Sequence, residues 1–229
     1  TINGYTVTYN TTENGGTGTI ASQTIAYGSS IPLPTTGASK TGWTFVGWNT
    51  DKNATTALSS LTMGTDNVIL YAIYRKEAVT LTADWHANGA TLSSTAQSTC
   101  TLAAVYNKAT QATSCTVTAP TITRTNYDIV GWNQSATATT NDSNYNTSTG
   151  KLTLTSSNTG KTWYAITKAQ VALTATFANN NGATASPATA TCYLYGSSES
   201  CQVTAPTVTA QTGFNHIGFS MNQNATSNS

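Results

Sequence analysis

Short segments in which apolar and polar residues alternate run through this chain. The segment "YTVTYN" places Tyr5, Val7 and Tyr9 on one face of an extended strand and Thr6 and Thr8 on the other. The same alternation recurs in "VTLTADW" (79–85) and "VALTATF" (171–177). A side-chain period of two predicts half-buried β-strands at these three places.

These strands open three copies of one sequence unit. Each is followed by an Asn-Gly pair, which favours a tight turn because both residues tolerate positive φ: Asn14-Gly15, Asn88-Gly89 and Asn181-Gly182. A second strand and a proline-marked extended run come next, with Pro34, Pro120 and Pro206 in register. A long polar loop leads to a closing strand, at 68–74 in the first copy and 161–167 in the second. Landmarks recurring in the same order predict a tandem repeat.

An aromatic-glycine motif lies in the second half of each copy. It reads "TGWTFVGWN" at 41–49, "TNYDIVGWN" at 125–133 and "TGFNHIGFS" at 212–220, and its last glycines are 84 and 87 residues apart. The residues at issue are Trp43, Phe45, Gly47 and Trp48, then Tyr127, Gly131 and Trp132, then Phe214, Gly218 and Phe219. Strand periodicity places Trp43 and Phe45 on one face and Trp48 on the other, and Gly47 indicates a bulge or a close approach of another segment.

Two interpretations of this motif are open. Its aromatic rings either fill the core of each copy or form an exposed platform for sugars. The position of Trp48 is occupied by Phe219 in the third copy, where a sugar platform would lose much of its stacking face. This replacement favours packing.

The predicted fold class is mainly β: tandem small repeat domains with little helix, at most one helical turn in the long loop of each copy. The expected domains are 1–77, 78–169 and 170–229, joined by the short segments "RKEA" (75–78) and "KAQ" (168–170). The third copy ends before any closing strand. We expect either that the sequence was cut there or that a strand from elsewhere completes the sheet.

Composition narrows the choice of partners. Only 7% of the residues are charged, the formal net charge is +1, and the nine Lys and Arg residues are scattered, so we expect no nucleic-acid partner. Threonine supplies 50 of the 229 residues, as in secreted or surface-displayed β proteins. No apolar run of 18 residues is present, so no membrane span is expected in this segment.

Cysteine placement follows the repeat. Four cysteines allow three connectivities, but Cys100 and Cys115 flank the second hairpin of copy two, and Cys192 and Cys201 flank its counterpart in copy three. The first copy has a short "YGSS" turn at this place and no cysteine. We therefore predict the disulfides Cys100–Cys115 and Cys192–Cys201, each stabilising its unit by about 3 kcal/mol, and an oxidising, extracellular compartment.

Candidate chemistry is sparse. The carboxylates show no recurring pair suited to acid–base catalysis: Glu13, Asp51, Asp66, Glu77, Asp84, Asp128, Asp142 and Glu199. No nucleophile-elbow sequence is present, and His86 and His216 lie at no metal-ligand spacing from the cysteines. The loop "NDSNYN" (141–146) could offer oxygen ligands to Ca²⁺, but it has one carboxylate, which favours a solvated turn. We predict no catalytic residue, no metal site and no cofactor.

The order "YTVTYN", "YGSSIPLP", "KTGWTFVGWN" and "LYAIY" closely resembles the Listeria–Bacteroides repeat, also called the internalin B-repeat. Copy one matches the pattern over residues 5–75, whereas copies two and three match more loosely and add the cysteine hairpins. The resemblance implies small β-grasp-like modules strung in tandem on bacterial surface proteins, as stalks, spacers or adhesive regions.

From these observations we expect a non-enzymatic stalk or adhesin region, extracellular and held at the cell surface by parts outside this chain. One alternative is a carbohydrate- or host-receptor-binding module that uses exposed aromatics and the Cys loops. A second is a self-assembling fibre subunit completed by strand donation. The expected partners are correspondingly a host or cell-surface glycan or protein, or neighbouring copies of the chain.

Overall fold

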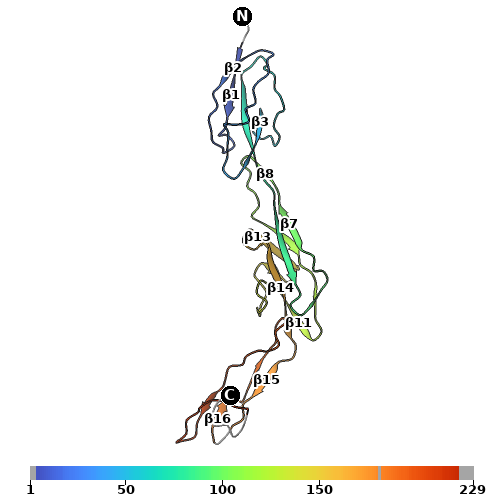
Figure 1. Cartoon of the computed structure of the whole chain (residues 1–229), viewed down its shortest axis with the longest axis vertical. Coiled ribbons are helices and arrows are strands. Elements are labelled where there is room, and N and C mark those ends of the chain that lie inside the picture. Colours follow the sequence, from blue (N-terminus) through green and yellow to red (C-terminus); the bar gives the residue numbers. More distant parts are fainter. Residues whose placement is uncertain (1–3, 180–181, 222–229) are drawn as a thin grey trace. The chain divides into compact units, whose positions relative to one another are not determined.

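A computed structural model describes residues 4–179 and 182–221, and every regular element in these ranges is a β-strand (Figure 1). The expectation of little helix is therefore met in the described residues. The single helical turn expected in the long loops does not form there; residues 50–67 and 134–144 run as turns and bends with an isolated bridge. Side-chain oxygens of Asn49, Asp51 and Asn133 accept the backbone N–H two residues ahead, which stabilises turns over helix.

The first repeat forms one sheet in the order β2-β1-β4-β3. Its strands are β1 (Gly4–Asn10), β2 (Gln23–Ala26), β3 (Thr44–Asn49) and β4 (Val68–Lys76). β1 runs parallel to β4, which is the closing strand, and β2 and β3 lie antiparallel at the two edges. The last strand in sequence therefore occupies the middle of the sheet.

The second repeat has the same arrangement, with its sheet in the order β11-β14-β5-β7. These strands are β5 (Val79–His86), β7 (Ser98–Leu102), β11 (Tyr127–Asn133) and β14 (Lys161–Ala169). Again the opening strand β5 is parallel to the closing strand β14. Two smaller sheets accompany it: β6 (Thr91–Leu92) with β10 (Ile122–Thr123), and β12 (Tyr145–Asn146) with β13 (Lys151–Thr155) and β9 (Ser114–Thr118).

The segment expected as a third repeat, residues 170–229, contains two separate two-stranded ribbons in its described part. They pair β15 (Leu173–Thr176) with β17 (Thr189–Cys192), and β16 (Thr184–Ser186) with β18 (Thr207–Thr209). Asn181 of the predicted third Asn-Gly turn lies outside the described residues.

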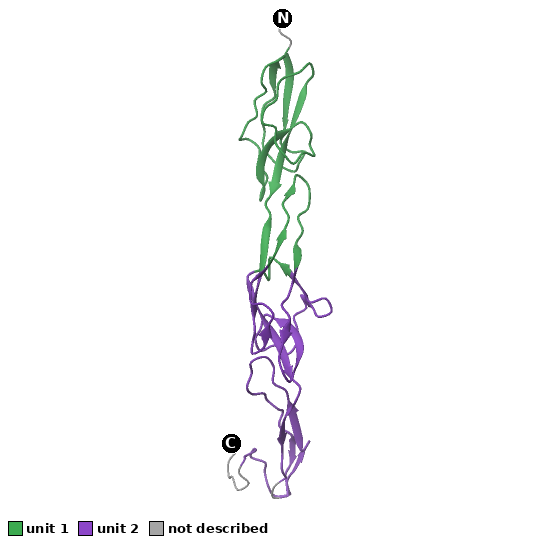
Figure 2. Cartoon of the chain, turned by 90° about the vertical axis from the view of Figure 1, so that its right-hand side faces the viewer, with its two compact units in different colours: residues 1–82, 99–116, 154–159 green, residues 83–98, 117–153, 160–229 purple. Residues whose placement is uncertain are grey.

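By its internal contacts the chain forms two compact units, coloured separately in Figure 2. Unit 1 comprises residues 1–82, 99–116 and 154–159, and unit 2 comprises 83–98, 117–153 and 160–229. Unit 1 thus includes the cysteine hairpin at 99–116, which belongs to the second repeat by sequence. The division into domains 1–77, 78–169 and 170–229 stays a prediction.

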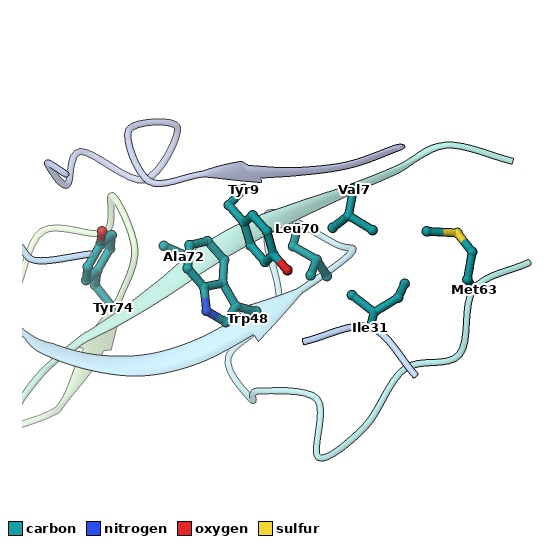
Figure 3. Close-up of a cluster of buried hydrophobic side chains, with 8 residues drawn as sticks. All are labelled: Val7, Tyr9, Ile31, Trp48, Met63, Leu70, Ala72 and Tyr74. Carbon is teal, nitrogen blue, oxygen red and sulfur yellow. The ribbon is translucent and has the colours of Figure 1, made fainter. Parts of the chain in front are cut away.

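The core of the first repeat lies where alternation predicts it. Val7 and Tyr9 of β1 face Leu70 of β4 and Trp48 of β3, and Figure 3 shows their side chains pointing toward one another. The cluster also includes Ile31, Met63, Ala72 and Tyr74. Its members are at most 6% exposed, so the inward positions of three strands form one apolar centre.

The second repeat fills its core with side chains that differ in size from those at the equivalent positions of the first repeat. Ala83 stands where the first repeat has Val7, and Trp163 stands where it has Leu70, as the parallel registers show. Both replacements are fully buried. A smaller residue beside a larger one keeps the core filled, because interiors tolerate exchanges that conserve total volume.

The joints predicted from "RKEA" and "KAQ" are largely strand. Arg75 and Lys76 belong to β4, and residues 168 and 169 belong to β14. Arg75 and Lys76 pair antiparallel with β8 (Val105–Tyr106). The strand pairing of the expected short joint cannot be read from this polar stretch.

Candidate functional site: the aromatic-glycine motif and the hairpin tips

Gly47 and Gly131 form equivalent β-bulges. The register between β3 and β4 shifts between Phe45 and Gly47, and that between β11 and β14 shifts between Ile129 and Gly131. Both glycines have φ of 140°, which side-chain-bearing residues avoid. A Cβ on Gly47 would lie 2.5 Å from the Cβ of Ala57. The predicted bulge and close approach are confirmed here.

Trp48 and Trp132 lie inside the protein. Trp48 is 1% exposed, packs edge-on against Tyr9 at 5.3 Å between ring centroids, and donates its indole N–H to the carbonyl of Pro34 at 2.7 Å. Trp132 is fully buried and packs against Trp85 at 4.6 Å, but its indole N–H has no partner among the described residues. Both rings hold their own repeat together and offer no face to a ligand.

In the first two motifs, the first aromatic ring, Trp43 or Tyr127, is covered by a cation. Nζ of Lys40 lies 3.7 Å from the ring centroid of Trp43, and Cζ of Arg124 lies 3.6 Å from that of Tyr127. Lys40 and Arg124 occupy the same place in the repeat, three residues before the ring. Desolvation lowers the pKa of Lys40 and repulsion from Lys108 adds to it. These rings are half-buried and capped on one face.

The third motif is more open in its described part. Phe214 is 67% exposed, whereas Phe219 packs against Phe177 at 5.2 Å and His216 at 5.0 Å. Gly218 retains the bulge conformation, with φ of 143°. Gln211 stands where the first two repeats have Lys40 and Arg124, so this motif lacks the capping cation.

Sequence reasoning missed a pair of buried asparagines. Nδ2 of Asn14 donates to the carbonyls of Lys52 and Ala72, at 3.0 and 2.9 Å. Nδ2 of Asn88 donates to those of Ala136 and Ala165, at 2.9 and 3.0 Å. Both asparagines belong to the Asn-Gly pairs that we read only as turn formers, although their recurrence in register was visible. Each ties the turn to the loop after the aromatic motif and to the closing strand.

The structure contains the disulfides Cys100–Cys115 and Cys192–Cys201, the pairing that the repeat favours. Each closes the base of a hairpin that is longer than its counterpart in the first repeat. In that first hairpin Gly28 donates its N–H to the carbonyl of Met63 at 2.9 Å, so the "YGSS" turn closes on its own repeat.

A depression of about 550 Å³ lies beside the first of the long hairpins, within unit 1. It is lined by Glu13, Asn14, Lys52, Asn53, Thr55 and residues 105–109. Glu13 lies 3.2 Å from Nζ of Lys52 and 3.4 Å from Nζ of Lys108, and these contacts lower the pKa of its carboxyl group. Glu13 compensates only one of these two lysines, so the charged groups that line the depression leave a net positive charge.

The loop considered for Ca²⁺ satisfies its own polar groups. Oδ1 of Asp142 accepts hydrogen bonds from the backbone N–H and the side-chain amide of Asn144, both at 2.8 Å. Nδ2 of Asn141 donates to the carbonyl of Tyr145 at 3.2 Å. No group of three or more His, Cys, Asp or Glu side chains that could hold a metal ion occurs in the part of the chain that the structure describes.

Comparison with known families decides what kind of repeat this is. The family model of the Listeria-Bacteroides repeat domain matches the chain twice, over residues 5–73 and 82–158. The chain belongs to this family. No curated protein and no solved structure matches it. The third copy expected over 170–229 lies outside the two matches and stays a prediction.

Membership in the Listeria-Bacteroides repeat family suggests a repeat region of a surface protein. The family and the two disulfides are compatible with an extracellular surface protein. Within the described ranges, no helix has the length and hydrophobicity that a membrane crossing requires.

Proposed function

We propose that this chain is a non-enzymatic spacer and adhesive segment of a bacterial surface protein, extracellular and displayed at the cell surface. The observation that carries the proposal is the use of the repeated aromatics within the protein itself. Trp48 and Trp132 are at most 1% exposed, and the rings of Trp43 and Tyr127 are capped by cations. A sugar-binding module instead presents open aromatic faces, so the repeats have the construction of a scaffold.

Surface display tests the spacer role. An epitope tag would be placed at the N-terminus of the full chain on a bacterial surface and compared with the same tag on a version lacking residues 1–77. Binding of a large antibody should be stronger with the full chain, because each added repeat extends the tag past the surface layer. Equal binding would contradict a spacer role.

Glycan and host-cell binding by the purified full chain tests the runner-up, a receptor-binding module. The spacer proposal predicts no saturable binding to glycans. Phe214 is the most exposed aromatic of the three motifs. Saturable glycan binding that is lost in the Phe214→Ala variant would favour the receptor-binding module over the spacer. Trp48→Phe would serve as the buried control.

A second candidate, self-assembly by strand donation, rests on the third repeat. In the first two repeats the opening strand pairs with a parallel closing strand, whereas β15 pairs only with β17 among the described residues. Val171 and Leu173 there are 75% and 48% exposed. An open edge of this kind accepts a strand from a neighbour. Strand donation predicts oligomers that grow with protein concentration. A peptide of sequence "NVILYAIYRK" (67–76) should disperse them. A monomer at all concentrations would reject strand donation.

A further inference from the structure

The tip of each disulfide-closed hairpin is bound by the end of the closing strand of the preceding repeat. In unit 1, Tyr106 pairs with Arg75 and the N–H of Asn107 donates to the carbonyl of Tyr74 at 2.8 Å. In unit 2, Tyr195 forms an antiparallel β-bridge with Lys168, and the N–H of Gly196 donates to the carbonyl of Thr167 at 2.9 Å. Arg75 and Lys168 are equivalent positions of β4 and β14, so the same docking occurs twice.

A cation from the preceding repeat holds each tip. Nζ of Lys40 donates to the carbonyl of Asn107, and Nη1 of Arg124 donates to the carbonyl of Gly196. These are the same cations that cap the motif aromatics. A hydrogen bond from a charged donor is roughly twice as strong as a neutral one. The ring beneath orients the cation, because a cation–aromatic contact favours one position of the flexible side chain.

The two carbonyls can face these cations because the tip residue adopts a left-handed conformation. Asn107 has φ of 58° and Gly196 has φ of 52°. Asn107 uses its side chain as well: its Nδ2 donates to the carbonyl of Ala54 at 2.9 Å. Gly196 has no room for a side chain, since a Cβ there would lie 2.3 Å from Nδ2 of Asn88. Ser197 instead donates its hydroxyl to Oδ1 of Asn88 at 2.9 Å.

The disulfides close the bases of these hairpins. The chain between Cys100 and Cys115 is long for a hairpin, and ordering it on a partner would cost conformational entropy. A cross-link removes part of that cost in advance by restricting the free hairpin. The first repeat needs none, because its shorter tip closes on Met63 of its own repeat.

We propose that the disulfide-closed hairpin acts as a latch between successive repeats. Its tip binds the end of the closing strand of the repeat before it. A Lys or Arg of that preceding repeat, three residues before the motif aromatic, holds the tip by donating to its backbone carbonyl. The partner it fits is therefore a repeat that carries Lys-Thr-x-aromatic or Arg-Thr-x-aromatic, as at Lys40 and Arg124. Latching makes the preceding repeat more resistant to opening. The inference goes beyond the spacer role and does not depend on it.

Amide hydrogen exchange of the full chain tests the latch through the central amides of the closing strands, which the tips do not touch. Lys40→Gln, which places at the first repeat the residue found at Gln211, should speed exchange of the central amides of β1 and β4 about tenfold, as loss of a charge-assisted hydrogen bond implies. Exchange in β5 and β14 should stay unchanged. Arg124→Gln should give the reverse pattern, so each variant controls the other.

Three further variants sharpen the result. Lys40→Arg should keep β1 and β4 within about twofold of the parent, because Arg124 performs the same role. Lys151→Gln removes an exposed charge of β13 and should change neither repeat, whereas Lys40 is half-buried. Cys100→Ser with Cys115→Ser should speed exchange in β4 as well as in the hairpin. Nζ of Lys40 also donates to the carbonyl of Asn14 in its own repeat at 3.0 Å, so the cysteine variant is the decisive one. Unchanged exchange of the central amides of β4 in that variant, or faster exchange confined to residues 74–76 and 103–111, would overturn the proposal.

Discussion

The first and second repeats share one strand order but keep it with different side chains. Val7 gives way to Ala83 and Leu70 to Trp163, while the bulged glycines, Gly47 and Gly131, are the same in both. The buried asparagines, Asn14 and Asn88, also bond equivalent carbonyls. This fold therefore depends on a few positions where the backbone needs one residue type, whereas its core tolerates exchanges that conserve total volume.

The repeats also differ in how they satisfy a buried indole. The N–H of Trp48 donates to Pro34, while that of Trp132 has no partner in the described part of the chain. An unpaired buried donor costs free energy relative to an apolar group of the same shape. Both repeats pack this indole against an aromatic ring of the opening strand, Tyr9 in the first and Trp85 in the second, so the unpaired donor is a cost in the second repeat alone.

Substitution of the bulge glycines should break both repeats alike. Gly47→Ala and Gly131→Ala should each lower the free energy of unfolding by about 3 kcal/mol, because φ of 140° is strained for alanine and the new Cβ would meet a neighbour. Urea unfolding of the full chain, followed by tryptophan fluorescence, measures this loss. Gly64→Ala is the control, because a Cβ there meets nothing within 4 Å. A bulge variant as stable as Gly64→Ala would contradict the role of the bulge.

Removal of the buried asparagine side chains should come next in size. Asn14→Ala and Asn88→Ala each leave two carbonyls without their donor, which costs about 2 kcal/mol. Asn88→Ala should cost more than Asn14→Ala, since Asn88 also accepts from Ser197. Thermal unfolding compares the two with Asn53→Ala, an exposed control. If Asn14→Ala proved the more harmful, the extra contact to Ser197 would contribute nothing.

The indole difference predicts unequal losses from one substitution. Trp48→Phe removes a hydrogen bond and some packing, so we expect a loss of about 2 kcal/mol. Trp132→Phe removes an unpaired donor, which offsets part of its packing loss, so we expect about 1 kcal/mol. Hydrogen exchange of β4 and β14 assigns each loss to its repeat. Equal losses of unfolding free energy in the two variants would show that the hydrogen bond from Trp48 to Pro34 does not contribute to stability.

Local pattern predicted the elements of this fold well. The alternation around Val7, the bulge at Gly47 and the cysteine pairing all follow from rules that act within a hairpin or one repeat. The central place of the parallel closing strand did not follow, because parallel pairing joins segments that are about 60 residues apart and leaves no local signature.

The hairpin tips show the same limit at the candidate site. Lys40 and Arg124 recur at one place in the repeat, which the sequence displays, but their acceptors are backbone carbonyls of Asn107 and Gly196. Any residue type supplies a carbonyl, so no pattern of side chains identifies it. The segment "RKEA" likewise reads as a polar joint because its strand pairing uses backbone groups alone.

The weakest expected effect concerns Glu13, whose carboxylate contacts Lys52 of the first repeat and Lys108 of the hairpin of the second repeat. These contacts lower its pKa from the usual 4.5, so their stabilisation is present above that pH and is lost as the pH falls through the lower folded-state value. The pair is solvent-exposed, so Glu13→Gln should lower the melting temperature only slightly and salt should screen the difference. Thermal unfolding of parent and variant between pH 3 and pH 7, at low and high salt, measures it. Asp66→Gln is the control: it removes an exposed carboxylate of the same repeat for which no lysine contact is seen among the described residues. It should leave the pH dependence of the melting temperature unchanged. If the pH dependence of the melting temperature were the same in Glu13→Gln as in the parent, the lysine contacts of Glu13 would not contribute to stability.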